Sequence, residues 1–354
     1  MNPNGETLSP RMEAQRIAFG PVLFQVIVAL RDLGILRHIH LQGPSGCTTK
    51  DIASACNIAP YGVQVLLESA FGGGVVAFDH HETPARWTLT KVGEVLYRDP
   101  LTKVNIDFIA DVCYEGLLDL QASIKSGRPE GLERLSHGGE TVYRALPNLQ
   151  EKCKASWFAF DHFYSDQVFT AALTVLLGRR PRQILDIGGN TGRMAARCRQ
   201  LDPTVSVTIA DLPEQINAAQ QALKDLKTEG VSFYPIDLLS SKKELPKGFD
   251  AVWMSQFLVC FPPEDIIAIL KEASRCLTPQ GRLWILDTYW DTQTEEIAKF
   301  CLLQTSPYFT CIANGTSKIY SAADMGQMVS AAGLRVVECH DNLGFGHSLW
   351  GLVS

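Results

Sequence analysis

Residues 184–192 read ILDIGGNTG, an apolar segment that runs directly into a glycine-rich turn. The helical pattern of residues 193–200 follows, so this part of the chain predicts a buried strand, a turn and a helix. Glycine tolerates positive φ and lets backbone amides approach a ligand closely. A nicotinamide-binding turn needs glycine at its first, third and sixth positions. Counted from Gly188, these positions hold Gly188, Asn190 and Arg193, so that fingerprint is absent.

Alternating strand and helix patterns continue from this turn to residue 353. The expected strands are 183–187, 206–210, 231–235, 251–255 and 281–287, followed by 334–339 and 348–353. The last two are too close together for a helix to lie between them, so they must form an antiparallel hairpin. The order predicts an α/β, doubly wound, Rossmann-like sheet with a C-terminal antiparallel hairpin. Such a hairpin is typical of the class I methyltransferase version of this fold.

The N-terminal part is mainly helical and resembles a winged helix. Helices are expected over 19–33, 51–56 and 61–71, then a hairpin of strands 75–78 and 86–90 whose tip is 79–83. DNA-binding winged helices present basic or amide side chains to the duplex. The 61–71 helix has one Glu and neither Lys nor Arg, which favours burial against a second subunit over DNA binding.

The chain has 354 residues, and its length and composition are typical of a two-domain globular protein. The net charge of -6 disfavours nucleic acid as a partner. No apolar run reaches the eighteen or so residues that span a membrane, and residues 1–10 lack a signal-peptide core. The ten cysteines include no Cys-x-x-Cys pair, which predicts reduced thiols, a cytoplasmic location and no metal site. The expected domains are 1–105 (winged-helix-like, dimerisation), 106–178 (helical linker and substrate-pocket wall) and 179–354 (cofactor binding).

Two acids follow the next two expected strands. Asp211 ends the 206–210 strand, where a carboxylate can accept both ribose hydroxyls, and Asp237 follows the 231–235 strand, where it can accept an adenine amino group. Either acid alone could be a solvated loop residue or a helix cap. Together with Asp186, Gly188 and Gly192, they predict one nucleoside site that fits S-adenosylmethionine.

These residues resemble the plant-type O-methyltransferase family of class I S-adenosylmethionine-dependent methyltransferases, in its bacterial small-molecule branch. The resemblance rests on residues 186–192, residues 210–213 and the turn at Asp237, and it extends over almost the whole chain. It implies S-adenosylmethionine as cofactor, S-adenosylhomocysteine as product, and a small aromatic substrate, free or carrier-bound. It also implies a homodimer formed through the N-terminal domain, with intertwined segments that help to close the partner's active site.

The resemblance and the expected fold together define two groups of candidate site residues. The cofactor group is Asp186, Gly188, Gly189, Asn190, Gly192, Asp211, Leu212, Asp237, Leu238, Ser255 and Gln256. The substrate group is Phe160, His162, Phe163, Val259, Cys260, Tyr308, Asn342 and His347. The aromatic run 157–164 is either ordinary core packing or one wall of an apolar substrate pocket.

One position departs from the family pattern. The family usually places a catalytic His after the fourth strand of this sheet, and Val259 stands there in this chain. Valine cannot accept a proton. His347 and His162 are the candidates for a replacement base, although each could equally be a hydrogen-bonded scaffold residue. Positioning alone can also supply much of the rate, because the sulfonium is already reactive.

The sequence therefore leaves several functions open. The first is methyl transfer to a small phenolic secondary metabolite, with O-methylation favoured. The alternatives are C- or N-methylation by positioning without a protein base, and a family member that binds the cofactor but performs other chemistry, such as decarboxylation or hydroxylation. A winged-helix transcription regulator is a further alternative, which the acidic net charge opposes.

Overall fold

The computed structural model describes residues 9–79, 84–136, 139–240 and 244–354. They divide into two compact units, Met1–Ala110 and Asp111–Ser354. The expected hairpin tip at 80–83 lies outside the described residues. The finer boundary expected at residue 178 stays a prediction.

The first unit has the expected helix, turn, helix and hairpin order. Thr48 caps α4 through a reciprocal bond with Asp51, and Pro60 occupies the first turn of α5. Leu30, Ile52, Val63 and Trp87 belong to its fully buried core. The elements are α1 (Pro10–Ala18), α2 (Gly20–Asp32), α3 (Ile35–Gln42), η1 (Gly43–Ser45), α4 (Thr49–Cys56), α5 (Pro60–Gly72), β1 (Val76–Asp79), β2 (Arg86–Leu89), α6 (Lys91–Arg98) and α7 (Pro100–Phe108), followed across the unit boundary by η2 (Ile109–Cys113).

The second unit contains a seven-stranded sheet with the order β5-β4-β3-β6-β7-β9-β8. Its strands are β3 (Gln183–Ile187), β4 (Ser206–Asp211), β5 (Val231–Pro235), β6 (Phe249–Ser255), β7 (Leu277–Thr288), β8 (Arg335–Leu343) and β9 (His347–Val353). The first five are parallel, and β9 pairs antiparallel with both β7 and β8. The Rossmann-like sheet and its C-terminal hairpin are therefore confirmed.

Three strands begin earlier than expected: β6 at Phe249, β9 at His347 and, by the widest margin, β7. β7 starts at Leu277 rather than at residue 281, because Leu277 pairs with Phe249 before a register shift brings Arg282 opposite Ala251. The turn residues 279–281 thus lie inside an irregular strand.

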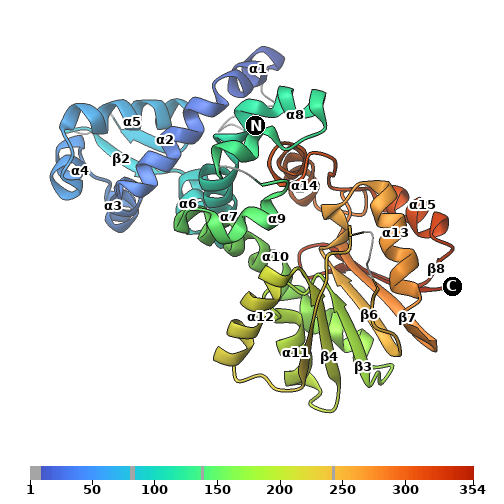
Figure 1. The fold of residues 1–354 in the computed structure, drawn as a ribbon. Coiled ribbons are helices and arrows are strands. Elements are labelled where there is room, and N and C mark those ends of the chain that lie inside the picture. Colours follow the sequence, from blue (N-terminus) through green and yellow to red (C-terminus); the bar gives the residue numbers. More distant parts are fainter. Residues whose placement is uncertain (1–8, 80–83, 137–138, 241–243) are drawn as a thin grey trace. The chain divides into compact units, whose positions relative to one another are not determined.

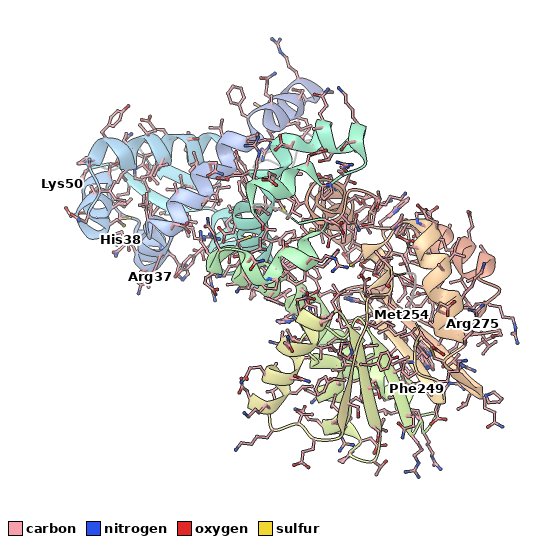
Figure 2. The ribbon with its side chains drawn as sticks, in the orientation of Figure 1. Arg37, His38, Lys50, Phe249, Met254 and Arg275 are labelled. Atoms are coloured by element: carbon pink, nitrogen blue, oxygen red, sulfur yellow. The ribbon has the colours of Figure 1, made fainter. Side chains whose placement is uncertain are left out.

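Helices cover both faces of the sheet, so its strands are apolar on both sides. Alternate residues of β6 divide between the faces: Val252 and Met254 pack with α13 and α15, whereas Ala251 and Trp253 pack with α10, α11 and α12 (Figure 1). Figure 2 labels Phe249 and Met254, which both belong to the core on the α13 side. The helical elements are η3 (Gly116–Asp119), α8 (Leu120–Ser126), η4 (Glu130–Arg134), α9 (Val142–Ala145), η5 (Leu146–Asn148), α10 (Glu151–Leu177), α11 (Arg193–Leu201), α12 (Pro213–Asp225), η6 (Leu258–Cys260), α13 (Pro263–Ser274), α14 (Glu296–Tyr308), η7 (Phe309–Ala313) and α15 (Ala322–Ala331).

No single helix of the described residues has the length and apolar character to cross a membrane. The pair α1 and α2 meets those two criteria jointly, but it is bent by 59°.

Candidate active site

The glycine turn lies where β3 ends, at the carboxyl edge of the sheet, between β3 and α11. Its backbone is shaped by Gly188 (φ +74), Asn190 (φ +47) and Gly192 (φ +77). A Cβ on Gly188 would lie 2.1 Å from the ring of Phe257, and a Cβ on Gly189 would lie 2.7 Å from Asp186 Oδ2. These two positions therefore require glycine because neighbouring side chains approach the backbone closely.

Asp211 at the end of β4 is fixed to this turn. Its Oδ2 accepts a hydrogen bond from the Asn190 backbone N–H at 2.8 Å, and its Oδ1 accepts one from Leu212 N–H at 2.8 Å. Each carboxylate oxygen can accept more than one bond, so both retain capacity for further donors. Burial raises the pKa of Asp211 to about 6, against the lowering effect of the two backbone bonds.

Asp186 lies beneath the turn and is 2% exposed. Burial, followed by the nearby charge of Asp211, raises its pKa well above the usual range. Its Oδ2, Asn190 Oδ1 and Ser255 Oγ at the end of β6 are buried without a hydrogen-bond partner among the described residues. Buried polar atoms are normally paired, so this group has room for donors and acceptors from a ligand.

Asp237, beyond β5, is held by two protein groups, and its predicted contact with the adenine amino group stays a prediction. Its Oδ2 forms an ion pair with Arg144 at 2.6 Å, and its Oδ1 accepts a bond from Leu239 N–H at 2.9 Å. Arg144 lies on α9, 93 residues earlier in the chain. The adjacent Leu238 is 8% exposed and packs in the core on the α13 side.

The middle of α10 lies against the glycine turn. Asn190 Nδ2 donates to Asp161 Oδ2 at 3.1 Å, His162 Nε2 lies 3.3 Å from Thr191 Oγ1, and Arg193 pairs with Asp166. Burial, then Asp166, raises the pKa of Asp161 to about 7. Burial, then Arg193, lowers the pKa of His162 to about 4. No local pattern distinguishes Asp161 as a site residue, because its neighbours in the chain do not predict which face of the helix meets the turn.

Four side chains close to this contact form an interior polar cluster, consisting of Tyr143, Asp161, Cys260 and Tyr308. Electrostatic interactions connect these groups, and burial raises the pKa of Cys260 to about 12 and that of both tyrosines well above their usual range. Trp157 lies one helical turn before Asp161 on α10, and its Nε1 donates to Tyr308 at 2.7 Å. Of the predicted substrate residues, Cys260 and Tyr308 therefore come together with α10.

Val259 lies in η6 and is 7% exposed. Its backbone N–H and that of Thr288 donate to the carboxyl of Asp287 at the end of β7, whose pKa burial raises to about 7. These bonds hold the backbone at Val259, where the sequence resemblance predicts a catalytic His. They leave an apolar side chain there, as the sequence predicts.

His347 on β9 is fully buried, and its Nε2 lies 2.6 Å from Gln256 Nε2. An amide nitrogen can only donate, so the imidazole nitrogen in this contact must be the acceptor. Burial lowers the pKa of His347 to about 4. Both sequence candidates for a base are thus neutral near pH 7 and weakly basic.

The remaining predicted substrate residues, Phe160, Phe163 and Asn342, have the following surroundings, and their role stays a prediction. Phe163 stacks on Phe345 at the tip of the β8–β9 hairpin, with ring centroids 5.4 Å apart. Phe160 contacts Tyr164 on the same helix, with centroids 5.0 Å apart. Asn342 is exposed on β8 with φ +60.

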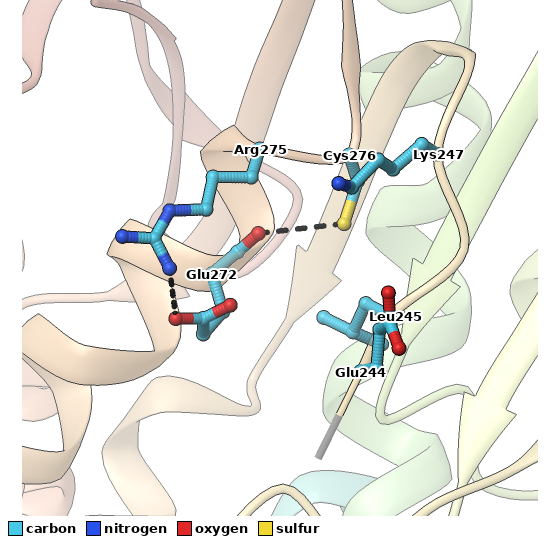
Figure 3. Close-up of a pocket in the computed structure, with 6 residues that line it drawn as sticks. All are labelled: Glu244, Leu245, Lys247, Glu272, Arg275 and Cys276. Atoms are coloured by element: carbon cyan, nitrogen blue, oxygen red, sulfur yellow. Dashed lines mark hydrogen bonds and ion pairs between the residues drawn. The ribbon is translucent and has the colours of Figure 1, made fainter.

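A pocket of about 210 Å³ lies at the opposite edge of the sheet (Figure 3). It lies between the segment that precedes β6 and the end of α13, and it is lined by Glu244, Leu245, Lys247, Glu272, Arg275 and Cys276. Ligands of open α/β sheets bind at the carboxyl ends of the strands. This pocket is at the amino end of β6 and is not the candidate active site.

The described residues contain no group of three or more His, Cys, Asp or Glu side chains that could hold a metal ion. The turn, in contrast, fits a nucleoside cofactor. It combines glycines that admit no Cβ, an acid with spare acceptor capacity at the next strand, and three buried polar atoms without partners.

The sequence and fold of this chain are similar to those of known proteins. L-tyrosine C(3)-methyltransferase of Streptomyces lavendulae is 24% identical over 321 residues, covering 90% of this chain and 85% of that protein. Aclacinomycin 10-hydroxylase of Streptomyces purpurascens is 28% identical over 179 residues, covering 50% and 45%. An O-methyltransferase from neocarzinostatin biosynthesis, solved with S-adenosylhomocysteine and 1,4-dihydroxy-2-naphthoic acid, has the same fold, with a TM-score of 0.73, 19% identity, and coverage of 99% and 100%.

Family models match both units of the chain. Residues 11–83 match a Dimerisation2-like domain, and residues 159–335 match the O-methyltransferase domain. The second match spans half of the 354 residues, so the chain belongs to the plant-type O-methyltransferase family of S-adenosylmethionine-dependent methyltransferases.

Proposed function

We propose that this chain transfers a methyl group from S-adenosylmethionine to a small aromatic, phenolic metabolite, with oxygen as the expected acceptor atom. The observation that carries the proposal is the glycine turn at the end of β3, bonded through Asn190 N–H to Asp211 at the end of β4. Bound S-adenosylmethionine supplies a methyl group activated by a sulfonium. The protein's task is then to position the acceptor and to manage its proton.

The cofactor residues divide by the strand that positions them. Asp186, Gly188, Gly189, Asn190 and Gly192 come from the end of β3 and its turn, Asp211 and Leu212 from β4, Asp237 and Leu238 from β5, and Ser255 and Gln256 from β6. Asp211 is proposed to accept the two ribose hydroxyls, because each of its oxygens already accepts one backbone bond and can accept another. Asp237 serves the adenine amino group in this proposal, with Arg144 holding its carboxylate in place.

The acceptor is proposed to lie beside the interior polar cluster, between α10 and η6. Trp157 and Tyr308 offer flat apolar surface there, and Tyr143 offers a buried hydroxyl close to Cys260. The carboxyl of Asp287 accepts a hydrogen bond from the Val259 backbone N–H and so holds η6 in place. An aromatic ring with one or two polar substituents suits these surroundings.

Proton removal by a histidine is not part of the proposal. His347 accepts from Gln256 and has no exposed surface, and His162 has a pKa near 4. A phenol that reaches the site already ionised needs no protein base. A neutral amine also attacks without prior proton removal and afterwards releases its proton to water. Transfer to a ring carbon of a phenolate gives a dienone, which becomes aromatic again when its ring proton passes to water; the similarity to a tyrosine C-methyltransferase keeps this as the second candidate. The hydroxylase relative motivates the third candidate, cofactor binding with other chemistry.

The decisive experiment combines binding and transfer. Asp211→Ala should weaken S-adenosylhomocysteine by about 1.5–3 kcal/mol in calorimetry, because charge-assisted bonds to the ribose are lost. Asp225→Ala is the matched control, an exposed acid on α12. Unchanged affinity in a folded Asp211→Ala variant would refute the cofactor assignment.

Transfer of an isotope-labelled methyl group to a panel of phenols, aromatic amines and aromatic amino acids then separates the candidates. Mass and fragmentation of the products show whether O, N or C is methylated. Firm binding without any transfer would favour the non-methylating candidate.

We also propose a homodimer formed through residues 11–83, and a cytoplasmic location. The dimerisation-type domain supports the first, and the ten cysteines, which the structure leaves as free thiols, agree with the second. Whether the substrate is free or carrier-bound can be tested by offering both forms to the enzyme.

A further inference from the structure

We propose that Asp161 binds the α-ammonium group of the methyl donor's methionine part, and of S-adenosylhomocysteine. The inference rests on the proposed function, because it assumes that the glycine turn holds this cofactor. It assigns a cofactor contact to helix α10. The other proposed cofactor residues all lie at the carboxyl ends of strands β3, β4, β5 and β6.

The position of Asp161 is fixed by Asn190. Asn190 donates its side-chain amide to Asp161 Oδ2 at 3.1 Å and its backbone N–H to Asp211 Oδ2 at 2.8 Å. One residue of the turn therefore links a carboxyl at the proposed ribose position to a second carboxyl on the far side of the turn. A nucleoside seated on Asp211 would extend its 5′ substituent along this turn, and the 5′ substituent is the amino-acid part.

Within the described residues, Asp161 forms no ion pair with Lys or Arg. Arg193 acts on it electrostatically but forms its ion pair with Asp166. Among the buried charged side chains of the described residues are Asp186 and Asp287, and no Lys or Arg. Desolvation of the Asp161 carboxyl, followed by the nearby charge of Asp166, raises the pKa of Asp161. A ligand ammonium would supply the missing positive charge.

Hydrogen-bond capacity also fits an ammonium group. The Asp161 side chain is 28% exposed, and among the described residues its Oδ1 has no hydrogen-bond donor. An ammonium has three N–H donors, whereas a sulfonium has none. The neighbouring His162 is neutral near pH 7 and does not compete as a cation.

The experiment compares two ligands on two variants. S-adenosylhomocysteine carries the amino-acid part, and 5′-methylthioadenosine has the same adenine, ribose and thioether without it. Asp161→Asn keeps an oxygen that can accept from Asn190 but removes the charge. We expect it to weaken S-adenosylhomocysteine by roughly 10- to 100-fold in calorimetry, while 5′-methylthioadenosine changes by less than about twofold.

Asp166→Asn is the matched control, an acid on the same helix that bonds Arg193 rather than Asn190. It should leave the ratio of the two affinities unchanged, and melting curves should show that both variants are folded.

Other outcomes overturn the inference in distinct ways. Equal weakening of both ligands by Asp161→Asn would mean that Asp161 only shapes the turn through Asn190. No change in either affinity, with a raised KM for an amine-bearing acceptor, would assign the carboxyl to the acceptor instead. Failure of the wild-type protein to bind S-adenosylhomocysteine would refute the proposed function itself rather than this contact.

Discussion

The resemblance to the family predicts a catalytic histidine at the position of Val259, and we expect that neither His162 nor His347 replaces it. His347 is fully buried against Gln256, and His162 lies against Thr191. Burial lowers the pKa of both to about 4. A base with this pKa provides little driving force for taking a proton from a phenol near neutral pH.

We therefore expect His162→Gln and His347→Gln each to keep kcat within about tenfold of wild type, since removal of a true general base typically costs about 10²–10⁴ in rate. Steady-state kinetics with saturating S-adenosylmethionine measures this, and calorimetry controls for altered cofactor affinity. A fall in kcat of about a thousandfold in one variant would make that histidine the base.

The converse substitution, Val259→His, should not raise activity on simple catechols. Val259 is 7% exposed, and its backbone N–H is bonded to the buried carboxyl of Asp287. The larger imidazole would have to displace the packed neighbours of Val259. A clear gain in activity would show that the pocket keeps the family geometry.

The buried carboxyl of Asp161 makes stability depend on pH. Its pKa is raised from 3.8 to about 7, so between these values the folded state holds a proton that the unfolded state has lost. Its contribution to stability is full below about pH 4 and is lost as the pH rises to about 7. Asp161→Asn removes this loss.

The melting temperature of Asp161→Asn, measured without ligand, should therefore gain on wild type as the pH rises from 5 to 7, with no further gain at pH 8. Differential scanning calorimetry at the three pH values measures the difference. Asp225→Asn, an exposed acid, provides the baseline. A difference that is constant with pH would contradict the raised pKa.

At the scale of elements, the β3–α11 turn depends on a close approach at Gly188. Gly188 has φ +74 and faces the Phe257 ring, so an added methyl group would be strained in its backbone and would also clash with that ring. Gly333, after α15, has φ +80 with nothing within 4 Å of an added Cβ. The pair separates the cost of the conformation from the cost of the contact.

Gly333→Ala should lower the free energy of unfolding by about 1–2 kcal/mol, the cost of a left-handed backbone for a residue with a Cβ. Gly188→Ala should lower it by distinctly more and should also weaken S-adenosylhomocysteine binding. Urea unfolding followed by tryptophan fluorescence provides the first quantity and calorimetry the second. Equal losses of stability would mean that Phe257 moves aside at no cost.

The hairpin of β8 and β9 has a role of its own. Its tip is held by Gln293, whose amide donates to Tyr289 O and Gly346 O at 2.8 Å each, and by the stacking of Phe345 on Phe163. His347 follows directly and contacts Gln256 at the end of β6. The hairpin thereby links α10, through Phe163, to the end of β6, through His347 and Gln256.

At the scale of the whole molecule, the first unit exposes large apolar side chains. Ile17, Phe19, Val22, Tyr61 and Phe71 are 74%, 63%, 55%, 81% and 54% exposed. Residues of this kind are costly in water and are typical of surfaces that bind another protein. All five lie within the residues that match a dimerisation-type domain.

Light scattering should therefore give about twice the 39.0 kDa of one chain at micromolar concentration. An obligate interface buries more than about 2,000 Å² in total, so one charge at its centre should be disruptive. Phe19→Asp should shift the protein toward the monomer, whereas Leu226→Asp, at an exposed position of the second unit, should not. A wild-type mass near 39 kDa would rule out the dimer.

Much of the architecture follows from local sequence. Strands β3 and β5 have the expected bounds, and the order of strands and helices predicts the sheet, because two-residue and 3.6-residue periodicities are properties of short segments. The ILDIGGNTG turn likewise needs only its own residues, since positive φ is a local requirement.

The partners of the site residues were decided by the tertiary structure. Asp161 meets Asn190, Asp237 meets Arg144, and His347 meets Gln256 across separations of 29, 93 and 91 residues. Such contacts depend on the rotation of a long helix about its axis and on the order of strands in the sheet, neither of which a local pattern specifies. Burial, which changes the pKa of His162, His347 and Asp161, is likewise a property of the packed molecule, because it depends on atoms that come from distant parts of the chain.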